Sequence, residues 1–249
     1  MRRPNRWLSL VFLLGFLALI IIEQNCAATR DDTAMRDAIN SDIDALIVLL
    51  QSDDPTDRKR AAYDLGRNTQ KAKPALDLLK RLMVEDSSPE VKIAAAEAVA
   101  FIEGHGSNAV PALKKQLQDN VARVPQLQKQ VDASADDASL NALFETLNRI
   151  DKIINVVGSI GASAADVAPD LIDILKADLG HGYHDLVPSI GRALQSIGPA
   201  AKPVLPELEA YAKSERGKQN RQSINAAIDS IKGQSKQTPP EEPPLTDID

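Results

Sequence analysis

Aromatic side chains and cysteine are scarce in this sequence, and both shortages limit what it can be. Aromatic residues make up only 3% of the chain, whereas hydrophobic residues as a whole reach 43%, so small and aliphatic side chains must build the core. This composition suits closely packed helices and fits a β-sandwich poorly, because strands favour aromatic and β-branched residues. The single cysteine, Cys26, excludes a disulfide framework and a cysteine-based metal cluster within one chain.

Basic side chains are outnumbered as well. The 29 lysines and arginines face 35 aspartates and glutamates, which leaves a formal net charge of -6. General nucleic-acid binding relies on neutralising phosphates with basic side chains. A mildly acidic chain therefore disfavours a nucleic-acid partner.

The sequence also lacks the spacings that chemistry requires. His181 and His184 lie beside Asp178 and Asp185, which suggests a metal hypothesis, but no second ligand cluster accompanies them. There is no glycine-rich phosphate loop, no nucleophile elbow and no cysteine–histidine pair suited to catalysis. We therefore predict a protein that is not an enzyme and that uses no metal and no cofactor.

Residues 1–28 have the order of an export signal. Three arginines within the first six residues precede the apolar run 7–22, and small residues at 26–28 suit cleavage before Thr29. The run is long for a cleaved signal and short for a membrane span of about 20 residues, so a signal peptide and a transmembrane anchor stay open. Either way the basic end should remain in the cytoplasm and the body should lie outside it, in the cell envelope on the periplasmic or extracytoplasmic side.

An internal repeat dominates the rest of the chain. Four aliphatic anchor positions are each followed by a proline nine residues later and by a leucine eleven residues later. The anchors are Leu65, Ile102, Ile160 and Ile197, and the prolines are Pro74, Pro111, Pro169 and Pro206. The outer prolines lie 37 residues from their neighbours and the middle pair lies 58 apart, which indicates one period with an insertion.

Other columns of the repeat agree with helix pairs. Small or aliphatic residues stand four and three positions before each anchor, and the position seven before is apolar except at Arg58. Glycine follows three of the four anchors, where it can end a helix, and each proline can begin the next helix. Ser87 and Glu90 have capping-box spacing, which predicts a helix start before Val91. A fifth copy ends at Ile231.

These columns predict an all-α protein whose residues 29–232 form an α-solenoid of about five antiparallel helix pairs. A helix pair of this kind cannot bury its apolar face alone, so the pairs must stack on one another. The predicted units are 41–67, 72–104, 108–161, 165–198 and 200–232. An N-terminal apolar helix precedes the stack.

The repeat resembles HEAT repeats, and in particular the bacterial HEAT-like repeats found in phycobilisome lyases. The resemblance is carried by the segments 89–99, 160–171 and 197–208 and covers about residues 41–232. It implies the solenoid fold and a surface for binding other proteins, since such repeats serve many partners. The phycobilisome-lyase relatives imply chromophore chemistry, but an exported chain is in the wrong place for that role.

Two segments depart from the repeat. The insertion, at about 118–139, keeps helical spacing of its apolar residues, and it is either an extended helical hairpin or a protruding contact element. Residues 233–249 are rich in proline and acidic side chains, cannot bury a core and should be a disordered tail. That tail is either plainly solvated or a docking peptide.

Four polar residues stand five positions before the anchors and should share one face of the second helices: Arg60, Glu97, Asn155 and Arg192. This row is either a merely solvated face or a contact surface for a protein partner. We expect a non-enzymatic protein–protein interaction scaffold of the cell envelope, which binds its partner through the solenoid groove or the insertion and touches the membrane through residues 7–22 if these are uncleaved. The alternatives are an accessory subunit or lyase-like protein that binds a small ligand in the groove, and a purely structural spacer.

Overall fold

The computed structural model describes residues 43–134, 136–179 and 184–234, and every regular element within these ranges is helical. Two predictions fall on other residues. The export signal or anchor at 1–28 and most of the tail at 233–249 lie outside the described ranges. Within those ranges, no helix is both long enough and apolar enough to cross a membrane.

The described α-helices are, in chain order, α2 (Ile43–Leu49), α3 (Pro55–Arg67), α4 (Leu76–Glu85), α5 (Pro89–Glu103), α6 (Val110–Ser134), α7 (Asp137–Ile160), α8 (Ala168–Ala177), α9 (Val187–Ile197), α10 (Leu205–Ala212), α11 (Glu215–Gln219) and α12 (Arg221–Ile231). Short 3-10 turns, η1 (Lys73–Ala75), η2 (Gly106–Asn108), η3 (Gly161–Val167) and η4 (Gly198–Val204), lead from one pair to the next.

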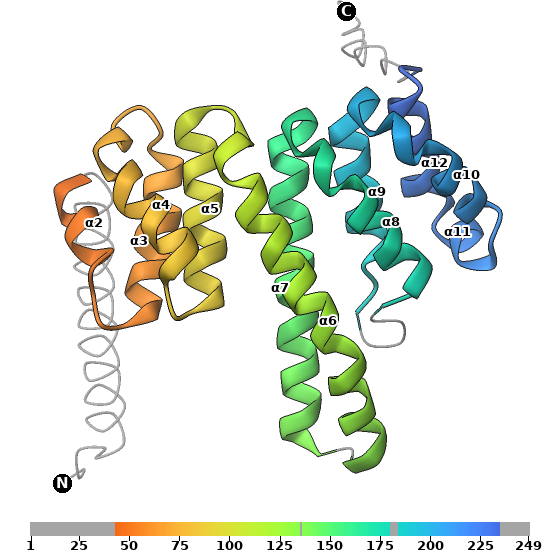
Figure 1. Ribbon diagram of the computed structural model, residues 1–249, viewed down its shortest axis with the longest axis horizontal. Helices are drawn as coiled ribbons and strands as arrows, with labels where there is room; N and C mark the ends of the chain where they lie inside the picture. The colour runs from red at the N-terminus through yellow and green to blue at the C-terminus, as the bar shows by residue number, and fades with distance from the viewer. Residues whose placement is uncertain (1–42, 135, 180–183, 235–249) are drawn as a thin grey trace, which may run out of the picture.

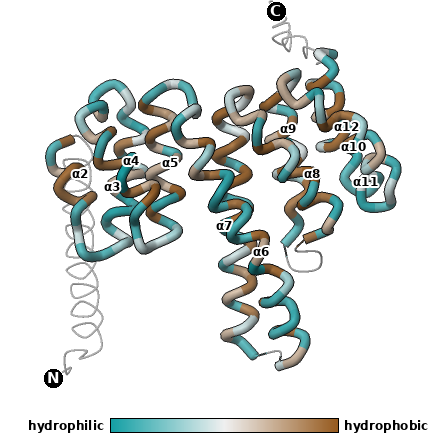
Figure 2. The backbone as a smooth tube through the Cα atoms, in the orientation of Figure 1, coloured by the Kyte–Doolittle hydropathy of each residue, from teal (hydrophilic) through white to brown (hydrophobic). Residues whose placement is uncertain are grey.

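The helices form five pairs that stand side by side in a row (Figure 1). The second helices α3, α5, α7, α9 and α12 pack against one another in sequence, and each packs on the first helix of its own pair. Along the helices hydrophobic and hydrophilic stretches alternate (Figure 2), as expected for elements that bury one face. The predicted stack of five pairs is confirmed, and the short helix α11 is an addition that the repeat did not predict.

Small residues let the second helices approach closely, as predicted. A Cβ atom placed on Gly66 of α3 would lie 3.0 Å from the Cα of Ala98 on α5. One placed on Gly158 of α7 would lie 3.2 Å from the Cα of Ala193 on α9. Both alanines stand four positions before an anchor. The residues at this position of the repeat therefore contact the backbone of the preceding second helix.

The glycines that follow the anchors do not all share one role. Gly161 and Gly198 have positive φ, 69° and 61°, and end α7 and α9 as predicted. The prediction is wrong for Gly66, which lies inside α3 and serves the close helix contact instead. In the second pair the helix continues one residue further, and Gly104 takes the positive φ of 72°.

Helix starts follow the predicted chemistry with one correction. The N-cap of α5 is Ser88 rather than Ser87, because the Val91 N–H donates to the Ser88 hydroxyl. Asp54 and Asp136 cap α3 and α7, because their carboxylates accept hydrogen bonds from the backbone N–H groups of Thr56 and Ser139. Three repeat prolines lie in the first turn of a helix and the fourth lies in the 3-10 turn before α4; they are Pro111, Pro169, Pro206 and Pro74.

The insertion lengthens α6 and α7 into a hairpin that reaches beyond the ends of the neighbouring helices (Figure 1). Its helical character is confirmed. Val124, Leu127 and Val131 of α6 are buried, although Pro125 inside this helix removes one backbone donor. The distal part of the hairpin is therefore held by packing between α6 and α7 themselves.

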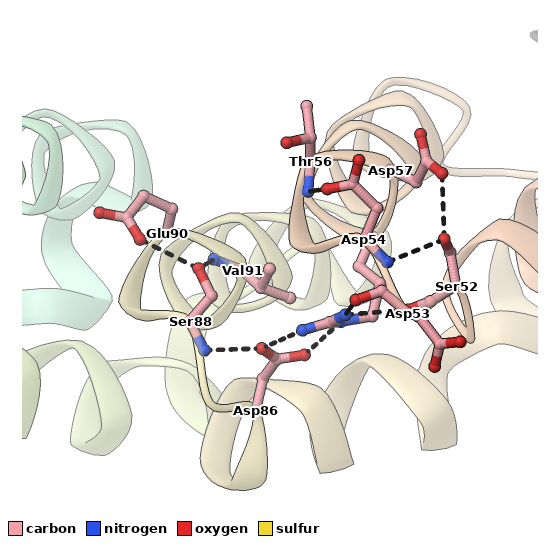
Figure 3. A network of polar contacts seen from close by, with 10 residues as sticks. Ser52, Asp53, Asp54, Thr56, Asp57, Asp86, Ser88, Glu90 and Val91 are labelled. Atoms are coloured by element: carbon pink, nitrogen blue, oxygen red, sulfur yellow. Dashed lines mark hydrogen bonds and ion pairs between the residues drawn. The ribbon is translucent and has the colours of Figure 1, made fainter.

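Arg58 is the one polar residue at the position seven before the anchors, which is otherwise apolar. It links the first helix pair to the second. Its guanidinium donates to both carboxylate oxygens of Asp86, at 2.7 and 2.8 Å, and to the carbonyl oxygens of Ser52 and Asp53. Asp86 also accepts from the backbone N–H of Ser88, so the cap of α5 belongs to the same network (Figure 3). An apolar side chain at position 58 could not donate hydrogen bonds to the buried Asp86 carboxylate.

A second buried polar group has no such compensation. Gln116 of α6 is 9% exposed, and neither its amide nitrogen nor its oxygen has a hydrogen-bond partner within the described residues. A buried amide without partners costs about 1–3 kcal/mol. Replacing Gln116 by leucine should therefore raise the free energy of unfolding by about 1–2 kcal/mol. Thermal unfolding followed by circular dichroism checks this, and a lower midpoint than that of the parent would contradict it.

Candidate binding groove between α3, α5 and α7

A hollow of about 840 Å³ opens where the second and third pairs meet. Contact between α5 and α7 is less extensive here than between the other neighbouring second helices, at the place where the repeat spacing lengthens. We call this hollow the α3/α5/α7 groove. Its lining residues are Thr56, Lys59, Arg60, Tyr63, Glu90, Ile93, Ala94, Glu145, Asn148, Arg149 and Lys152.

Apolar side chains form the floor of the groove, and one aromatic ring forms part of its wall. Ile93 and Ala94 of α5 are each 2% exposed. Tyr63 of α3 is 44% exposed, with the Arg67 guanidinium 5.8 Å and the Lys152 ammonium 5.6 Å from the centre of its ring. Cations at these distances are attracted to the face of an aromatic ring, so Tyr63 is held in place at the mouth of the groove.

Arg149 of α7 joins the two sides of the groove. Its guanidinium lies 2.5 Å from Glu90 on α5 and 3.2 Å from Glu145 on its own helix. Burial alone would raise the pKa of Glu90, but hydrogen bonds from Arg149 and the Ser88 hydroxyl outweigh it and leave this pKa below its ordinary value. Glu90 is therefore ionised at neutral pH, and Arg149 forms ion pairs with both acidic residues of the lining.

The α3 side of the groove keeps uncompensated positive charge. Arg60 is 3.7 Å from Asp64 with half of its side chain exposed. Lys59 is exposed and makes no ion pair with any residue that the structure describes. The lining holds four basic and two acidic side chains, in a chain whose net charge is -6. The lining residues thus carry a net positive charge on an acidic molecule, while Asp64 and Glu97, outside the lining, pair with Arg60 and Lys152.

Only one member of the predicted row lines the groove. Arg60 does so, whereas Glu97 is not part of the lining and pairs with Lys152 at 3.3 Å. The Asn155 amide donates to Asp151 on its own helix. The fourth member, Arg192, is exposed on α9 and donates to the Ser189 hydroxyl. The structure therefore brings Arg60 and Glu97 to adjacent helices around the groove and leaves Asn155 and Arg192 further along the stack.

Of the eleven lining residues only Arg60 was predicted, and the charged and aromatic residues that the prediction missed include Lys59, Tyr63, Arg149 and Lys152. Tyr63 follows Arg60 by three positions, which puts both on one helix face, and this spacing could have pointed to it. The two residues of α7 gave no comparable signal, because their positions depend on how the insertion separates α5 from α7.

The histidine segment gives no metal site within the described residues. His184 lies 3.8 Å from Asp151, while His181 falls outside the described ranges. No group of three or more potential metal ligands occurs in the parts of the chain that the structure describes.

Comparison with protein families supports the repeat type. A family model of HEAT repeats matches residues 43–128, which span the first two pairs and most of α6. Comparison with curated proteins and with solved structures finds no match. The more specific resemblance to the bacterial repeats of phycobilisome lyases stays a prediction. Residues 43–128 are thus similar to HEAT repeats, and the later pairs continue the same helical stack.

Proposed function

We propose that this protein is a non-enzymatic scaffold that binds an extended segment of a protein partner in the α3/α5/α7 groove. The observation that carries the proposal is the groove itself, which combines an apolar floor with a positive edge where two repeats part. Lys59, which makes no ion pair within the described residues, and half-exposed Arg60 would attract acidic side chains. Charges at the rim of an interface mainly give selectivity and fast association.

A peptide segment suits the groove better than a small ligand does. Small-molecule sites are enclosed and lined mostly by apolar and aromatic groups. This groove has one aromatic residue, Tyr63, and a rim of six charged side chains. An extended chain can place one side chain on the floor of Ile93 and Ala94 while its neighbours meet the charged rim. The small-ligand alternative predicted from the sequence gains no support from these residues.

We also propose that the scaffold works at the cell envelope. The support is the order of basic, apolar and small residues in 1–28. N-terminal sequencing of the protein from soluble and membrane fractions tests this. A mature start at Thr29 in a soluble fraction would favour the cleaved signal, whereas an intact N-terminus in a cytoplasmic fraction would contradict export.

Charge reversal on α3 tests the groove. The double variant Lys59→Glu with Arg60→Glu should lower the affinity for the copurifying partner about tenfold, equivalent to about 1.4 kcal/mol. Lys129→Glu, on an exposed lysine of the α6–α7 hairpin, should leave it unchanged. The measurement is titration of the recovered partner onto immobilised protein. Equal affinities for both variants would overturn the groove, and loss with Lys129→Glu alone would point to the hairpin.

A further inference from the structure

We propose that the chain's own acidic, proline-rich segment, residues 235–249, occupies the α3/α5/α7 groove of the same molecule. This inference rests on the proposed function, because it names an occupant for the same groove. The segment lies outside the described residues, so the argument uses its sequence and length together with the chemistry of the groove.

Charge is the first point of fit. The segment contains four acidic side chains, Glu241, Glu242, Asp247 and Asp249, against one lysine, Lys236. The groove presents the opposite balance, with four basic and two acidic side chains. Glu90 and Glu145 are both engaged by Arg149, so an incoming carboxylate meets mainly Lys59 and Arg60.

Shape is the second point. Pro239, Pro240, Pro243 and Pro244 favour the extended polyproline conformation, which loses little entropy on binding and packs against exposed aromatic rings. The groove offers such a ring in Tyr63, which its neighbouring cations hold in place. The apolar floor would then receive Leu245 or Ile248, the two aliphatic residues of the segment.

Reach is the third point, and the repeat makes it calculable. Helix α12 ends at its anchor, Ile231, which corresponds to Ile102 and Ile160 in the earlier pairs. Ala94 and Lys152 stand eight residues before those anchors, so the groove lies about 12 Å along the helix axes from the anchor level. Crossing α9 and α7 at 8–10 Å per helix adds about 25 Å sideways.

These two displacements combine to about 28 Å. Lys232 and Gly233 close the end of α12 in a turn, and the Gln234 N–H donates to the Asp229 carbonyl, so the free segment starts at Gln234. Asp247 stands 13 residues after Gln234, and 13 residues of polyproline conformation span about 40 Å. Leu245 and Asp247 can therefore reach the floor and the positive edge of the groove. The chain does not need a second molecule to supply the segment.

Occupation in cis has a regulatory consequence. A tethered segment acts at an effective concentration on the order of millimolar, so a partner must displace it to bind. A partner segment would bind the groove only where it fits better than the chain's own tail does.

A competition experiment tests the proposal on the full chain in a mild detergent. The probe is a fluorescein-labelled synthetic peptide with the sequence of residues 235–249, and its anisotropy reports binding. The acceptors are the native chain and a neutral-tail variant that carries Glu241→Gln, Glu242→Gln, Asp247→Asn and Asp249→Asn. The peptide should bind the neutral-tail chain about tenfold more tightly than the native chain, because the native groove is already occupied.

Matched variants locate the binding. Adding Lys59→Glu and Arg60→Glu to the neutral-tail chain should abolish peptide binding, whereas Lys129→Glu should not change it. Equal peptide affinity for native and neutral-tail chains, or no binding to either, would overturn the proposal. Light scattering decides the source of the segment, since concentration-dependent oligomers of the native chain that vanish in the neutral-tail variant would contradict occupation in cis.

The two proposals fail separately. If the peptide does not bind but the captured partner is still lost on charge reversal at Lys59 and Arg60, the groove is a partner site and the tail is not its occupant. If the peptide binds and the partner is indifferent to the same reversal, the groove holds the tail and the partner binds elsewhere.

Discussion

Replacing Arg58 by alanine should lower the free energy of unfolding by about 3 kcal/mol. The change would leave the Asp86 carboxylate, whose side chain is 3% exposed, buried without its counter-ion. It would also remove donors from two loop carbonyls, those of Ser52 and Asp53. We take the lower end of the range for a broken buried pair because the Arg58 side chain itself is 12% exposed. Urea unfolding followed by circular dichroism measures the effect.

A double replacement separates the ion pair from the space that it fills. Arg58→Met combined with Asp86→Leu removes both charges and keeps apolar volume, and it should recover most of the loss, since a buried pair replaced by apolar groups is often neutral. A double variant as unstable as Arg58→Ala would show that the attraction within the ion pair exceeds the free energy needed to bury its two charges.

The contribution of the Arg58–Asp86 ion pair to stability should be lost at acid pH. Burial alone would raise the pKa of Asp86, but the hydrogen bonds from Arg58 and the Ser88 N–H outweigh burial and lower this pKa. A carboxyl whose pKa is lower in the folded state contributes stability above the unfolded pKa, and this is lost as the pH falls through the folded value. The native chain should therefore lose stability more steeply below about pH 4 than the uncharged double variant.

Enlarging Ala193 to leucine should cost about 1–3 kcal/mol, and more if the stack cannot shift. Ala193 is 2% exposed on α9, and the Gly158 backbone of α7 already lies as close as a helix backbone can. The extra carbons would have to push α7 and α9 apart. Thermal unfolding measures the loss, with Ala210→Leu on the exposed face of α10 as the control. An unchanged midpoint for Ala193→Leu would mean that this close contact does not limit the packing.

The repeat made most of the fold predictable, because its columns report packing that recurs in each pair. The small column at Ala98 and Ala193 predicted close helix contacts, and these are where the glycine backbones of α3 and α7 lie. Ser87 was wrong by one residue because either of two adjacent serines can start the capping turn, and only the backbone path decides between them. Arg58 is polar where the repeat has an apolar residue. Its ion pair with Asp86, which is distant in the sequence, explains this exception.

The groove was less predictable than the fold. Arg60 was predicted from its column, but the assumption of one continuous row gave equal weight to Asn155 and Arg192, which lie away from the groove. What creates the groove is the separation of α5 from α7 next to the insertion. That separation depends on long-range packing of the lengthened hairpin, so Arg149 and Lys152 could not be assigned to the groove from the spacing of the repeat.

Photo-crosslinking from the groove tests the central claim most directly. A benzoylphenylalanine placed at Tyr63, inside the groove, should capture a specific partner protein in intact cells, more strongly when the tail is neutralised. The same probe at Val84, which is 61% exposed on α4 outside the groove, should capture none. Equal capture from both positions, or capture from Val84 alone, would contradict the assignment of the α3/α5/α7 groove as the binding surface.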